Sequence, residues 1–173
     1  DMIAMTRVFQ KYGFLVHGMF IIGYPMQEGI KLNLSAKERV GYFRTFIRKA
    51  RIDTIQVLMP VPLPGTEMTE RLKAQGRLLS KETIGWEYYD GNFPLFIPDA
   101  PMTPESMQWS LRQIMSYFYR FDKMFSVGLH TVAFPLIVFG FNNLKASWRQ
   151  WYRHWRNSVI RFGGWIIMQD WIK

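Results

Sequence analysis

Two apolar runs mark the expected strands. The first, FLVHGMFIIG, covers residues 14–23 and is followed by Tyr24 and Pro25. The second, DTIQVLMPV, covers residues 53–61 and continues into a proline-rich stretch. Runs of this length that are bounded by glycine and proline are typical of strands buried on both faces of a parallel sheet. We therefore expect a strand buried on both faces in the first run and a second strand in the other.

Helical periodicity predicts four helices around these strands. They cover residues 2–12, the segment from Ser35 to about residue 50, residues 67–75 and residues 104–120. The second begins at a capping box formed by Ser35 and Glu38. Strands that alternate with helices indicate an α/β fold. Two strands are too few to close an eight-stranded barrel, so we predict a partial (β/α) barrel fragment with parallel strands, followed by a helical carboxy-terminal extension.

The carboxy-terminal third carries a different pattern. Residues 124–144 contain no acid, lysine or arginine, a length near the minimum for crossing a bilayer, although two glycines, one histidine, one proline and two asparagines dilute the run. The next residues form a basic amphipathic helix. Its apolar face holds Leu144, Trp148, Trp151, Tyr152, Trp155 and Val159, and its adjacent side holds Lys145, Arg149, Arg153 and Arg156.

This helix has three interpretations. It lies on a membrane surface, it docks on the barrel as a lid, or it stacks on single-stranded nucleic acid. The uncharged run before it favours the membrane, and nucleic acid is the least favoured partner. The sequence alone leaves the choice between membrane and lid open.

Composition narrows the classes of protein further. The chain has 173 residues, 49% of them apolar, a net charge of +9 and no cysteine. Residues 122–173 hold seven basic and two acidic residues, which favours an anionic partner there. The missing cysteines exclude disulfides, thiolate zinc sites and cysteine-bound iron–sulfur clusters within this chain. No secretory signal is visible, so we expect a cytoplasmic protein, peripheral at the membrane if the tail binds lipid.

The chain divides into three expected parts. Residues 1–79 carry the strands, 80–121 a loop and a long helix, and 122–173 the basic, Trp-rich helical extension. The opening run reads as helix without a cap residue before it, which indicates a chain that enters partway through a domain. A partial sheet exposes an unpaired edge, so self-association is expected.

The first 121 residues resemble the radical S-adenosylmethionine family. HGMFIIGYP, residues 17–25, is similar to the late strand that ends in Gly-Phe/Tyr-Pro in that family, and PLPGT, residues 62–66, resembles its Pro-x-Pro-Gly-Thr turn. Trp86 with residues 89–91, then residues 102–105, resemble the segment after the barrel in the cobalamin-binding subgroup. Two features depart from the family: residues 26–28 replace Gly-Glu-Thr, and the Cys-x3-Cys-x2-Cys loop is absent.

The resemblance implies a function and a site. It implies the carboxy-terminal portion of an enzyme that reductively cleaves S-adenosylmethionine with a 4Fe-4S cluster, for radical chemistry on an unknown, possibly lipid-like substrate. The cluster ligands would lie outside this chain, and cobalamin would come from the parent protein. The implied cofactor-binding residues are Met19, Ile21, Gly23, Tyr24, Pro25, Gln56 and Leu58.

Individual roles follow from the same resemblance. Ile21 would pack on the adenine, Gly23 would let the backbone approach the nucleoside, and Gln56 would hydrogen-bond an adenine edge or the substrate. The simpler interpretation of Met19, Ile21 and Leu58 is ordinary core. His17 is better explained as a core or strand-start histidine than as a proton donor. The alternative function is a non-catalytic, membrane-associated binding or scaffold domain derived from a barrel remnant.

Overall fold

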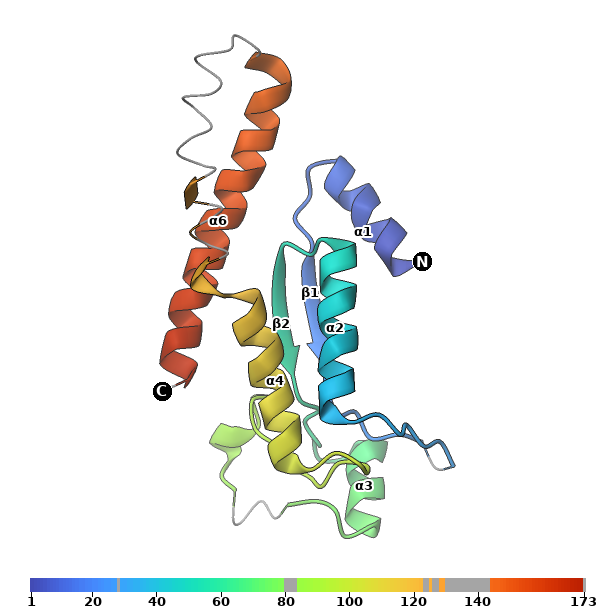
Figure 1. Cartoon of the computed structure of the whole chain (residues 1–173). Helices are drawn as coiled ribbons and strands as arrows, with labels where there is room; N and C mark the ends of the chain where they lie inside the picture. The colour runs from blue at the N-terminus through green and yellow to red at the C-terminus, as the bar shows by residue number, and fades with distance from the viewer. Residues whose placement is uncertain (28, 80–83, 123–124, 126–127, 130–143, 173) are drawn as a thin grey trace. The chain divides into compact units, whose positions relative to one another are not determined.

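A computed structural model describes residues 1–27, 29–79, 84–122, 125, 128–129 and 144–172 (Figure 1). Its elements are α1 (Met2–Lys11), β1 (His17–Ile21), α2 (Ala36–Ala50), β2 (Thr54–Leu58), α3 (Glu67–Ala74), a 3-10 turn (Trp86–Tyr88), α4 (Pro104–Phe118) and α6 (Leu144–Ile172). The expected alternation of helices and strands is confirmed. Most of the uncharged run at 124–144 lies outside the described residues.

The two strands form one parallel sheet. They are hydrogen-bonded neighbours, and Figure 1 shows both arrows pointing the same way. The amide of Asp53 donates to the Val16 carbonyl at 3.0 Å before the strands, and the amide of Ile22 donates to the Leu58 carbonyl at 2.9 Å after them. The prediction of adjacent parallel strands is therefore confirmed, as a mixed α/β arrangement with a short sheet.

The expectation that the first strand is buried on both faces is wrong for this chain. Alternate residues of β1 are exposed, and Met19 and Ile21 keep 66% and 55% of their surface. Phe20, by contrast, packs edge-on against Phe43 and Phe46 of α2, with ring centroids 5.6 and 6.0 Å apart. A continuous apolar run does not indicate which face of the strand is covered by other elements, because both faces carry apolar side chains.

The outer edge of β2 is capped at two points. The Tyr119 hydroxyl donates to the Ile55 carbonyl at 2.8 Å and accepts from the Ile55 amide at 3.1 Å. Farther along, the Met59 amide donates to the Gly91 carbonyl at 2.7 Å. Within the described residues, no third strand pairs with β1. The sheet therefore has one capped edge and one open edge.

One compact unit comprises Met19–Arg48 and Gln56–Ile114. Its core is supplied by the strands and by α2 and α4, and it includes Ile22, Val40, Ile47, Val57, Met59, Met107, Leu111 and Ile114. The predicted capping box starts α2, since the Glu38 carboxylate accepts from the Ser35 amide at 2.8 Å and the Glu38 amide donates to the Ser35 hydroxyl at 3.3 Å. The Ser35 hydroxyl, which donates to the Glu38 carboxylate at 2.6 Å, and the Ser35 amide both lower the pKa of Glu38.

A second unit comprises Asp1–Gly18, Lys49–Ile55 and Met115–Lys173. Asp53 is its polar centre, 2% exposed, and accepts from the Val16 amide at 2.9 Å and from the Asn157 amide group of α6 at 2.7 Å. Its first helix does have a cap, because the Asp1 carboxylate accepts from the Ile3 amide at 2.9 Å. The expectation of an uncapped start is therefore wrong.

The tail forms the expected helix. α6 covers 29 residues, and part of it is docked on the segment before β2. Within the described ranges, no helix combines the length and the apolar character that crossing a bilayer requires.

Candidate functional site

The carboxyl ends of β1 and β2 lie at the same end of the sheet. Ligands of α/β proteins bind at this end, because the loops that follow the strands lie together there. After β1 the chain continues through Ile22 and Gly23 to Pro25, and after β2 it continues through Met59 to Pro62. Of the predicted site residues, Ile21 and Leu58 end their strands and Gly23, Tyr24 and Pro25 follow β1, whereas Met19 and Gln56 lie at the middle of their strands.

The predicted residues divide between an exposed face and a buried turn. Met19, Ile21 and Gln56 are exposed, and they alternate with half-buried residues in β1 and with buried residues in β2, while Leu58 is half-buried. This face presents apolar side chains beside one amide, which is a surface suited to a flat heteroaromatic ring. The simpler interpretation of Met19 and Ile21 as core is wrong for the described chain.

The turn after β1 is shaped by packing against α4. Gly23 has a φ of +76°, which side chains other than glycine rarely adopt. A Cβ at this position would overlap the Met107 side chain. Pro25 is buried and Tyr24 is 56% exposed. Gly23 is therefore required for close packing on Met107, and its predicted role beside a nucleoside stays a prediction.

The segment after the 3-10 turn covers the end of β2. Gly91 accepts the Met59 amide and has a φ of +82°. A Cβ there would lie 3.3 Å from the Leu58 side chain and from the Met59 carbonyl. Nearby, Trp86 and Tyr89 bring their ring centroids within 4.9 Å. The motif at residues 89–91 thus has a definite position, directly against the second strand.

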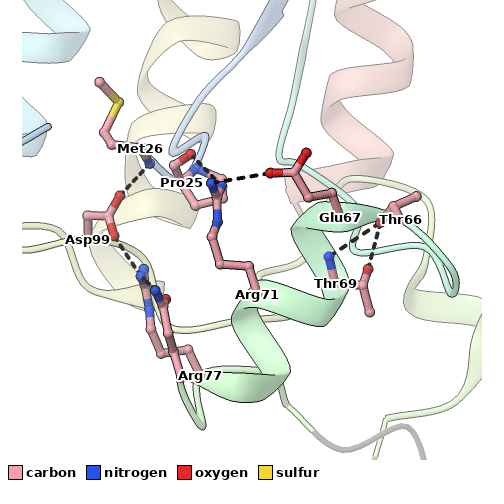
Figure 2. Close-up of polar contacts among 9 residues, drawn as sticks. Pro25, Met26, Thr66, Glu67, Thr69, Arg71, Arg77 and Asp99 are labelled. Carbon is pink, nitrogen blue, oxygen red and sulfur yellow. Dashed lines mark hydrogen bonds and ion pairs between the residues drawn. The ribbon is translucent and has the colours of Figure 1, made fainter. Parts of the chain in front are cut away.

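A polar clamp holds the loop after β1. We use this name for Arg71, Arg77, Asp99 and the backbone of Pro25 and Met26, which Figure 2 shows gathered together. Asp99 accepts from the Met26 amide at 2.7 Å and forms an ion pair with Arg77 at 2.7 Å. Arg71 of α3 donates to the Pro25 carbonyl at 3.4 Å. The clamp therefore fixes the loop to α3 and to residues near 99.

The charge of this region is positive. Arg39 donates to the carbonyls of Leu34 at 3.0 Å and Leu32 at 3.1 Å. Burial lowers the pKa of Arg39, and Asp99 partly offsets that shift. Arg77 keeps one buried nitrogen, Nη2, with no hydrogen-bond partner in the described structure. Arg71 also forms an ion pair with Glu67 at 4.0 Å, so three arginines face two carboxylates here (Figure 2). The group keeps one net positive charge, which favours an anionic partner.

The Pro62–Thr66 turn is explained by local structure. Thr66 is the N-cap of α3, and its hydroxyl oxygen accepts from the Thr69 amide at 3.3 Å (Figure 2). The same hydroxyl donates to the Leu63 carbonyl at 2.8 Å. Thr69 also donates to the Leu63 carbonyl, at 2.7 Å. The turn thus stops the strand and starts the helix, as its sequence suggests.

Sequence reasoning missed the clamp and the contacts of α4. Asp99 lies in a Pro-Asp-Ala-Pro stretch that reads as loop, and nothing in the residues between links it to Met26. Arg71 and Arg77 look like ordinary solvated charges of a short helix. Met107 carries the spacing of a core residue, which is visible in the sequence, but its contact with Gly23 is not.

His17 has a structural environment. Its Nδ1 lies 2.8 Å from the Thr54 hydroxyl at the start of the paired strands. This contact is consistent with a strand-start histidine. In the part of the chain that the structure describes, no three His, Cys, Asp or Glu side chains gather into a metal-binding group. No protein-family model, curated protein or solved structure matches this chain.

Proposed function

We propose that this chain forms the adenosine-binding edge of a radical S-adenosylmethionine enzyme. The observation that carries the proposal is the parallel pairing of β1 with β2, which puts both carboxyl ends at the same end of the sheet. The segments that resemble the family's motifs lie on these strands and after them, in the order that the family would require. The capped edge of β2 supports the assignment of β1 and β2 as the last two strands of a partial barrel. The other strands of that barrel would pair with the open edge of β1.

The exposed face would receive the nucleoside. Ile21 and Met19 would pack against the adenine, and Gln56 would donate to or accept from its edge. Leu58 and Gly91 would close the same side, since a Cβ added to Gly91 would lie only 3.3 Å from the Leu58 side chain. These residues fit a purine, because the apolar side chains would contact the ring and the single side-chain amide would hydrogen-bond its polar edge.

The metal centre would be held by other residues. The sequence has no cysteine, so this chain offers no thiolate to a 4Fe-4S cluster, and the ligands would come from outside it. When bound, the cluster supplies the electron that cleaves S-adenosylmethionine to a 5′-deoxyadenosyl radical. The residues of this chain would orient the adenosine and exclude water. We assign cobalamin, if the parent uses it, to residues outside this chain as well.

Binding by the 173-residue chain tests this assignment. We expect S-adenosylmethionine and adenosine to shift the methyl NMR signals of Met19 and Ile21. Ile21→Lys should weaken binding at least tenfold, because it places a charge where the adenine packs. Ile21 is 55% exposed, so the substitution should change the free energy of unfolding by no more than about 0.5 kcal/mol.

The matched control is Tyr42→Lys, on α2, where the side chain is 65% exposed. It should bind both ligands like the unaltered chain. Equal affinities for Ile21→Lys and the unaltered chain, or methyl signals that stay in place at saturating ligand, would remove the adenosine site from this face.

A further inference from the structure

α6 has a docked face along its second half. Asn157 donates to Asp53, and Arg161 donates to the backbone carbonyls of Asp53 at 3.3 Å and Ile52 at 3.4 Å. Arg161 also lies 4.7 Å from the centroid of the Phe118 ring. Farther along the helix, Gly164 faces the ring of Tyr119 and Met168 is 3% exposed. This face is thus fully used inside its own unit.

The opposite face of α6 is apolar and exposed. We call it the outer stripe and define it by Tyr152, Val159, Phe162 and Ile166, which are 46%, 53%, 51% and 45% exposed. Trp155 continues the same row and is 42% exposed, with its ring stacked on that of Tyr152. The members recur at intervals of three and four residues, so they fall on one side of the helix. Docking therefore leaves a continuous apolar row at the surface.

The charge of this helix selects the kind of partner. α6 holds five basic residues and one acidic residue. Arg156 lies 5.6 Å from the Tyr152 ring centroid and donates to the Gly13 carbonyl at 3.0 Å, which keeps a guanidinium beside the stripe. Two copies of a helix with this charge repel each other. An anionic surface attracts it, by about 1 kcal/mol for each basic residue near the lipid headgroups.

We propose that the outer stripe of α6 lies in the surface of an anionic lipid bilayer. The helix would rest parallel to the membrane, with the side chains of the outer stripe among the acyl chains and its basic residues other than the docked Arg161 near lipid phosphates. Val159 and Ile166 favour lipid over nucleic acid, because stacking on bases uses rings and has no use for aliphatic side chains. The docked face would meanwhile keep the rest of its unit attached to the helix. This inference stands independently of the proposed reaction.

Vesicle flotation with the full 173-residue chain tests the inference. We expect the chain to float with vesicles of phosphatidylcholine and phosphatidylserine at equal amounts, and to bind vesicles of phosphatidylcholine alone at least tenfold more weakly. Raising the salt concentration from 0.1 to 0.5 M should reduce the binding, because it screens the attraction. The double variant Phe162→Ser with Ile166→Ser should lower the partition coefficient at least tenfold.

A matched control separates the stripe from apolar exposure in general. The double variant Met5→Ser with Tyr42→Ser removes one aliphatic and one aromatic side chain from exposed helix positions, 57% and 65% exposed, outside α6. It should float like the unaltered chain. Circular dichroism should show equal helix content in all three proteins, because every altered side chain is exposed.

Two results would overturn the inference. One is equal flotation of the stripe variant and the unaltered chain. The other is a chain that stays in solution with anionic vesicles while sedimentation shows a dimer that the stripe variant abolishes, since this would assign the stripe to a second copy.

Discussion

Two buried polar side chains attach the carboxy-terminal segments to the region of β2. Asp53 joins the segment before β1 to α6 through its carboxylate, with hydrogen bonds of 2.9 and 2.7 Å. Tyr119 satisfies both backbone groups of Ile55 on the outer edge of β2. A buried backbone group left without a partner costs about 1–3 kcal/mol, so each side chain matters well beyond its size.

Tyr119→Phe tests the capping of the β2 edge. We expect the free energy of unfolding to fall by about 1–3 kcal/mol, because the amide and carbonyl of Ile55 lose their partner within a buried site. Urea denaturation at pH 7 measures the loss. A change below about 0.5 kcal/mol, the range of ordinary surface substitutions, would contradict the role assigned to the hydroxyl.

The same variant should also change how the free energy of unfolding depends on pH. Burial raises the pKa of Tyr119 above its usual value, although the hydrogen bond to Ile55 and the charge of Arg161 oppose the shift. An unfolded tyrosine ionises at about pH 10, so the folded state loses relative stability as the pH rises past that value. Tyr119→Phe should therefore show a smaller loss of stability between pH 8 and 10.5 than the unaltered chain.

At the scale of elements, α6 depends on a glycine to approach Tyr119. Gly163 and Gly164 are neighbours in the middle of this helix, where glycine is unfavourable by about 1 kcal/mol relative to alanine. A Cβ at Gly163 would meet nothing within 4 Å, whereas one at Gly164 would overlap the Tyr119 ring. The helix therefore keeps one glycine that close packing requires and one that it does not.

Two single substitutions test this docking. Gly163→Ala should raise the free energy of unfolding by about 0.5–1 kcal/mol through helix propensity. Gly164→Ala should lower it by about 1–3 kcal/mol, since the added methyl group must displace the Tyr119 ring. Thermal denaturation of both variants, side by side, measures the difference. If both variants gained stability equally, α6 would not be docked as described.

Patterns of local origin were the most predictable from the sequence. Ser35 and Glu38 lie three residues apart, and Thr66 directly precedes its helix, so their capping contacts could be inferred from neighbouring residues. The N-cap role of Asp1 was not predicted, because no turn precedes a cap at the first residue to mark it. The exposure of Met19 and Ile21 was not predicted either. Burial depends on which elements cover a strand, and an apolar run does not show which elements these are.

At the scale of the whole molecule, the candidate site was predicted in part. The strands and their direction follow from the apolar runs and the helix between them, and they place Ile21, Gln56 and Leu58 on neighbouring strands. The clamp could not be predicted, because Asp99 and Met26 are 73 residues apart. Their contact depends on the path of the chain between α3 and α4, where the sequence carries little periodicity.

The sheet itself is asymmetric. Tyr119 and the Gly91 carbonyl cap the outer edge of β2, while the described residues offer no strand to β1. An open parallel edge is a template for further strands. Under the proposed function, further strands would pair with this edge, and self-association of the 173-residue chain is the competing outcome.

The most direct test of the proposed function is 5′-deoxyadenosine formation. The complete polypeptide that carries this sequence would be purified without oxygen, supplied with iron and sulfide, reduced and given S-adenosylmethionine. We predict 5′-deoxyadenosine and methionine in equal amounts, with at least tenfold less product from Ile21→Lys. A polypeptide that binds no iron–sulfur cluster and releases no 5′-deoxyadenosine would contradict the proposed function.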